Sequence, residues 1–144
     1  MPVAPRVKSG LFYMLTHQEI FDRVVERARA SKRRCLGNDG EPLYRSGELT
    51  SFVGSLIPKD LYKPELEGYT IFLLMIERYI DVGAVKNLRM WSFLGELERI
   101  HANIEPSQWE TALGAFASVH DLKFEGVKGT HVQFKFFKPS MVKK

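Results

Sequence analysis

Apolar residues begin to recur at helical spacing just after residue 16. The segment Thr16-His-Gln-Glu19 has the sequence of a capping box, in which the threonine hydroxyl accepts from the third helical N–H and the glutamate reaches back. Leu15 and Ile20 occupy the two positions of a hydrophobic staple. One face of the segment is apolar through Ala28, so the pattern predicts a helix over about residues 17–32.

Three later segments have helical patterns as well. Residues 88–101 carry an apolar side chain at every third or fourth position, and residues 109–119 do the same after a break at Asn103 and Pro106. The run Ile71–Ile76 is apolar without interruption. Such a run favours a buried helix, with a central strand as the alternative, and it is also a candidate dimer face.

Strand patterns are short except near the C-terminus. There, residues 122–125 and 132–136 alternate apolar and polar around Lys128-Gly-Thr130, which predicts a β-hairpin with one buried face. A smaller hairpin is predicted from 34–36 and 43–45 around Asp39-Gly40. Residues 52–57 are predicted as a third short strand, and Pro58 is predicted to open one helical turn over 58–62.

These elements define an α+β fold of about four helices, a small antiparallel sheet and a C-terminal β-hairpin. The chain has 144 residues, which is the size of one ordinary domain. We expect residues 14–138 to form a single globular domain, preceded by an N-terminal extension over 1–13 and followed by a basic tail over 139–144.

Composition narrows the class of protein. Hydrophobic residues make up 44% of the chain and charged residues 26%, which is typical of a globular protein and not of a disordered one. No apolar stretch is long enough to cross a membrane, and residues 1–8 lack the apolar core of a secretory signal. A single cysteine, Cys35, cannot form an internal disulfide. We therefore expect a cytoplasmic protein with no membrane partner.

Positive charge is concentrated in two places. The chain has 21 Lys and Arg against 17 Asp and Glu, and six of the lysines lie in residues 122–144 with one acid. A second basic cluster spans residues 23–34. Either the two regions are solvated faces, or they attract an acidic protein or a polyanion. The partner-binding residues predicted on this basis are Lys123, Lys128, His131, Gln133, Lys135, Phe137, Arg29 and Arg33.

Signatures of catalysis are missing from the sequence. The four histidines are scattered without metal-ligand spacing, and no phosphate-binding glycine loop or nucleophile elbow occurs. We therefore predict no catalytic, cofactor-binding or metal-binding residues and no cofactor. The enzymatic alternative is a small hydrolase that uses Cys35 with a histidine, because such partners meet in space and not in sequence.

The last third suggests a nucleic-acid-binding alternative. Two helices joined by a short turn and followed by a lysine-bearing hairpin have the order of a winged helix-turn-helix, in which the hairpin contacts phosphates. The expected recognition helix, residues 109–119, contains no arginine or lysine, although duplex binding depends on such cations. Nucleic acid is therefore the second choice of partner.

Several segments resemble a group of small uncharacterised proteins encoded by bacteriophages and bacteria. The resemblance covers about residues 14–122 and rests on 16–25, on Leu43-Tyr-Arg-Ser-Gly47, on Val53-Gly-Ser-Leu-Ile-Pro-Lys-Asp-Leu-Tyr62 and on 94–101. Many relatives have cysteines at Ser51 and Ser55. The resemblance implies a phage setting but no established activity. The predicted function is a non-enzymatic accessory protein that binds a host macromolecule in the host cytoplasm, as a host-takeover or anti-defence inhibitor.

Overall fold

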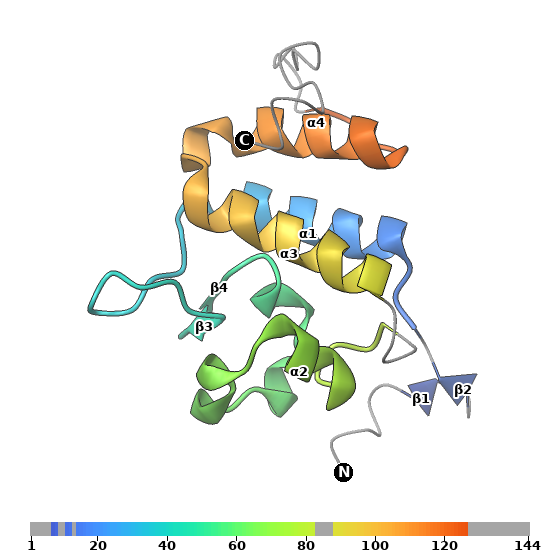
Figure 1. The fold of residues 1–144 in the computed structure, drawn as a ribbon. Coiled ribbons are helices and arrows are strands. Elements are labelled where there is room, and N and C mark those ends of the chain that lie inside the picture. The colour runs from blue at the N-terminus through green and yellow to red at the C-terminus, as the bar shows by residue number, and fades with distance from the viewer. Residues whose placement is uncertain (1–6, 9–10, 13, 83–87, 127–144) are drawn as a thin grey trace.

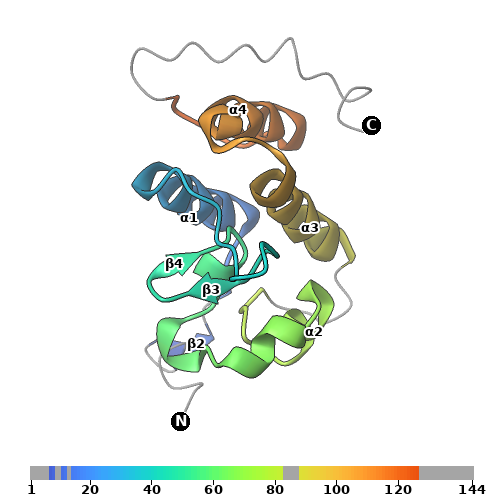
Figure 2. The same ribbon diagram turned by 90° about the vertical axis from the view of Figure 1, so that its left-hand side faces the viewer.

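The computed structural model describes residues 7–8, 11–12, 14–82 and 88–126. Within this part of the chain, the helices α1 (His17–Ala30), α3 (Leu88–Asn103) and α4 (Trp109–His120) pack against one another. Figure 1 shows α4 lying above α1 and α3, and Figure 2 shows the short elements of residues 45–76 below this pair. The fold is α+β, as the sequence predicts.

Helix α1 begins at the predicted capping box. The N–H of Thr16 donates to Oε1 of Glu19 at 2.9 Å, and the N–H of Glu19 donates to Oγ1 of Thr16 at 3.1 Å. The predicted apolar face is buried from Ile20 to Ala28. The three long helices are thus confirmed, because local capping and apolar periodicity agree with the tertiary packing.

A short hairpin, whose two strands have two residues each, follows α1. Strand β3 (Arg45–Ser46) pairs antiparallel with β4 (Leu49–Thr50), and Gly47 in the turn has a φ of +65° that glycine adopts without strain. The hairpin predicted from 34–36 and 43–45 is limited to one bridge between Leu36 and Pro42.

The strand predicted over 52–57 is wrong. This segment contains the 3₁₀ helix η2 (Gly54–Leu56). The Oγ of Ser51, which precedes the helix, accepts from the N–H of Gly54 at 2.9 Å. The helical turn predicted after Pro58 is present as η3 (Lys59–Leu61), and η4 (Pro64–Gly68) follows it.

The apolar run of residues 71–76 forms the short helix α2 (Ile71–Ile76), as predicted. Its expected full burial is wrong, because α2 packs by one side only, against α3. Leu74 and Met75 are buried, whereas Leu73 retains 39% of its exposure.

The core lies between the three long helices and η2. Its largest fully buried side chains include Trp109, Phe21, Phe52 and Phe93, and the rings of Phe52 and Trp109 meet edge to face at 4.9 Å. Phe93, Leu94 and Leu97 of α3 are buried in this core, so the opposite face of that helix points away from it.

The chain ends are described in part. Strands β1 (Val7–Lys8) and β2 (Leu11–Phe12) pair antiparallel within the predicted N-terminal extension. Residues 122–126 form no strand, and the turn and second strand of the predicted C-terminal hairpin lie outside the described residues, as does the tail 139–144. Among the helices that the structure describes, none has the length and apolar character needed to cross a membrane.

Candidate functional site

Cys35 and His101 lie side by side in the interior. The contact runs through the main chain, because the N–H of Cys35 donates to Nε2 of His101 at 3.0 Å. The thiol donates to the carbonyl oxygen of Leu49 at 3.3 Å, and burial raises the pKa of Cys35 above its ordinary value. A nitrogen that already accepts an N–H is not available to take a thiol proton. This arrangement does not fit a thiolate–imidazole nucleophile.

The ring of His101 is held as a neutral core residue. It has no solvent exposure, meets Phe52 edge to face at 5.3 Å and stacks on Trp109 at 5.7 Å. Burial, together with the charges of Arg27 and Arg34, lowers the pKa of His101 to about 4. Its Nδ1 therefore carries the proton, and this buried atom has no hydrogen-bond partner among the described residues.

Arg27 belongs to the predicted basic cluster but is buried. Its guanidinium donates to the carbonyl oxygens of Thr50, Ser31 and Arg33, the last two at 2.8 and 2.7 Å. The guanidinium carbon lies 5.5 Å from the centre of the Trp109 ring. Arg27 thus joins the end of α1 to β4 and is not available to a partner.

Two carboxylates bind main-chain N–H groups of the loops around the cluster of Cys35, His101 and Arg27. Glu67 accepts from the main-chain N–H of Tyr44 at 2.8 Å, from that of Arg45 at 3.1 Å and from the hydroxyl of Tyr62 at 2.7 Å. Glu98 accepts from the N–H of Val53 at 2.8 Å, and burial raises its pKa. Within the described part of the chain, no three His, Cys, Asp or Glu side chains could hold a metal ion. The cluster satisfies backbone groups in the interior.

The predicted partner-binding residues are placed only in part. Arg29 pairs with the buried Glu110, and its guanidinium lies over the ring of Phe124 at 5.4 Å. Arg29 and Lys123 line a groove of about 410 Å³ between α1 and residues 123–125. Arg33 is exposed but does not line this groove. The other five predicted residues lie outside the described part: Lys128, His131, Gln133, Lys135 and Phe137.

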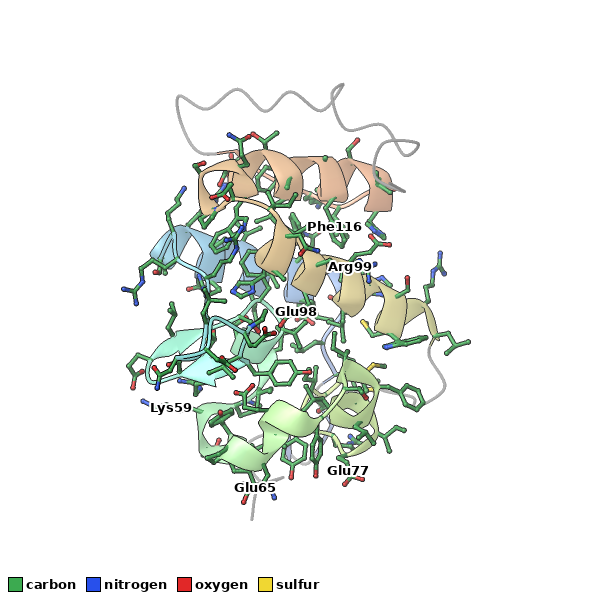
Figure 3. All side chains as sticks on the ribbon, turned by 60° about the vertical axis from the view of Figure 1, so that its left-hand side comes forward. Lys59, Glu65, Glu77, Glu98, Arg99 and Phe116 are labelled. Atoms are coloured by element: carbon green, nitrogen blue, oxygen red, sulfur yellow. The ribbon has the colours of Figure 1, made fainter. Side chains whose placement is uncertain are left out.

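A larger groove, which the sequence analysis missed, lies along the outer face of α3. Its volume is about 510 Å³, and Ile71 of α2 and Pro42 form one side of it. Figure 3 marks two consecutive residues that line it, Glu98 and Arg99. The lining residues from α3 are Trp91, Ser92, Gly95, Glu98, Arg99 and Ala102. We call this feature the α2–α3 groove.

The sequence held two signals for this groove. Gly95 interrupts a segment with otherwise good helical character, and Trp91 lies off the apolar stripe of that segment. The opposite wall could not be found in this way, because it depends on where α2 packs.

Comparison with known proteins finds nothing similar: no protein-family model, no curated protein and no solved structure matches this chain.

Proposed function

We propose that this chain is a non-enzymatic accessory protein that acts by binding another protein. The observation that carries the proposal is the outer face of α3, where Trp91 is 46% exposed and Leu88 is 63% exposed beside the α2–α3 groove. Exposed large apolar side chains around a concavity are typical of sites that dock a macromolecule. The resemblance to phage-encoded proteins favours a host protein as the partner, reached in the host cytoplasm to block a defence or divert a host process.

The geometry of the interior supports binding over catalysis. The thiol of Cys35 has a raised pKa and donates to a carbonyl, while the facing nitrogen of His101 is already occupied. A hydrolase of the Cys–His type needs a thiol whose pKa is lowered and a histidine nitrogen that is free to accept the thiol proton.

The winged-helix alternative has weaker support. Helices α3 and α4 follow one another closely, as in a helix-turn-helix, but eight of the twelve residues of α4 are buried. The helix also contains no lysine or arginine. A recognition helix needs a polar and cationic face that is free to enter a groove. Protein is therefore the preferred partner.

The proposal is tested by affinity capture from bacterial lysate, with and without nuclease treatment. We expect the same protein to be captured in both samples and to remain bound after washing. Loss of the captured protein after nuclease treatment would indicate a nucleic-acid bridge and would overturn the proposal. A parallel titration with duplex DNA at low salt is expected to show no binding, whereas strong binding that falls steeply with salt would favour the winged-helix alternative.

A further inference from the structure

Gly95 lies in the middle of α3 without a packing reason. A Cβ built at this position would meet nothing closer than Nη1 of Arg99 at 3.6 Å, which is an ordinary contact. The φ of Gly95 is not positive, so the backbone does not require glycine either. Glycine in a helix interior costs about 1 kcal/mol relative to alanine. Because glycine has no side chain, the floor of the α2–α3 groove is open at this position.

The residues around Gly95 form one continuous strip. Positions 88, 91, 92, 95, 99 and 102 fall on one face of a helix, opposite the face that α3 buries. Ser92 and Ala102 are small, so the floor is bare beyond Gly95 as well. Trp91 rises at the edge and contacts Phe72 of α2 edge to face at 6.1 Å. The strip therefore offers an apolar wall beside a low floor.

The charges at this face favour an acidic occupant. Arg99 lines the groove and is exposed, and among the described residues it forms no ion pair. The one carboxylate of the groove, Glu98, is held by the hydrogen bond that it accepts from the N–H of Val53 at 2.8 Å. The exposed charge of the groove is therefore the guanidinium of Arg99, which attracts an anion.

We propose that the α2–α3 groove binds an acidic and apolar segment of a partner protein. A carboxylate of the segment pairs with Arg99, and a neighbouring apolar side chain lies over Gly95 against Trp91. This inference rests on the proposed function and specifies the surface and the partner chemistry. Arginine binds carboxylates in a bidentate geometry, and a half-exposed tryptophan is a frequent anchor of protein interfaces.

The test uses a library of short random peptides displayed on phage and selected on the immobilised full chain. We expect the selected peptides to contain Asp or Glu close to an aromatic or aliphatic residue. The binding of one selected peptide is then measured by fluorescence anisotropy. The substitution Arg99→Glu should weaken it by about tenfold or more, because it replaces an attraction by a repulsion.

Arg23→Glu is the matched control, since Arg23 is an exposed arginine outside the groove and is not among the partner-binding residues predicted from the sequence. It makes the same change in net charge and should alter the affinity less than about threefold. Thermal unfolding of both variants should match the wild type, because neither side chain forms an ion pair among the described residues.

Three results would overturn the inference. They are selection of basic peptides or of none, equal loss of affinity in the two variants, and a wild-type dimer that Arg99→Glu dissociates, since a second copy would then be the occupant. Capture from lysate separates this inference from the proposed function. If the Arg99→Glu variant captures the same nuclease-resistant protein as the wild type, the binding function stands and only this surface is wrong. If capture itself requires nucleic acid, the proposed function fails as well.

Discussion

The inner and outer faces of α3 differ in whether the packing explains their unusual residues. On the inner side, the packing explains two unusual residues: Nε2 of His101 accepts from the N–H of Cys35, and Gly54 of η2 lies where a Cβ would be 1.9 Å from the carbonyl oxygen of Tyr44. On the outer side, Gly95 has no such neighbour, and Trp91 is exposed. A residue that lowers stability without an internal reason is a better indication of function than one that the packing explains.

The packing of the inner side is tested most strongly at Gly54. Gly54→Ala would force the new methyl group into the main-chain carbonyl of Tyr44, which cannot rotate away as a side chain would. We expect a loss of about 4 kcal/mol or more in the free energy of unfolding, measured by urea denaturation. Gly68→Ala is the control, because nothing lies within 4 Å of the Cβ built there. A loss as large in the control, or none at Gly54, would contradict the packing explanation.

Arg27 tests whether the inner polar groups are structural. Arg27→Met keeps much of the side-chain volume but leaves three carbonyl oxygens without their donor. We expect a loss of about 3 kcal/mol in the free energy of unfolding. The exposed Arg33→Met should change it by less than about 0.5 kcal/mol. Equal effects of the two substitutions would place Arg27 among the ordinary surface cations.

His101 predicts a specific pH dependence of stability. Its pKa is 6.5 in the reference state and about 4 in the folded chain, so below pH 6.5 the unfolded chain binds the proton more readily. The stability that neutral His101 supplies is complete above pH 6.5 and is lost as the pH falls toward 4. The loss amounts to about 3 kcal/mol.

The measurement compares wild type with His101→Gln, in which the amide oxygen can still accept from the N–H of Cys35. Urea denaturation between pH 7 and pH 4 should show a steeper decline for the wild type. Parallel declines would mean that His101 titrates normally in the folded protein.

The parts of the fold that depend on local sequence could be predicted. The capping box at Thr16 and the periodic apolar residues of α3 and α4 define helices without knowledge of distant contacts. The prediction for residues 52–57 is wrong because their conformation depends on Ser51 and on Glu98, which accepts from the N–H of Val53. No local sequence pattern predicts that Val53 binds a carboxylate 45 residues away.

The candidate sites show the same limit. Counting charges placed Arg27 in a surface cluster, but the carbonyls that bury it belong to the end of α1, the following loop and β4. The groove itself combines a glycine visible in the sequence with a wall from α2 that only the packing reveals. The resemblance to phage proteins stays a prediction, as does the role of the lysines after residue 126.

The binding role of the outer face of α3 is tested directly by a pair of substitutions at Gly95, with stability and peptide binding measured on each. Gly95→Ala and Gly95→Leu should both raise the free energy of unfolding by about 0.5–1 kcal/mol, because each replaces glycine in a helix interior. Only the leucine should fill the groove, weakening the selected acidic peptide by about tenfold or more while alanine changes its affinity little. A Gly95→Leu protein that is more stable and still binds the peptide as the wild type does would contradict the claim that the outer face of α3 is the binding surface.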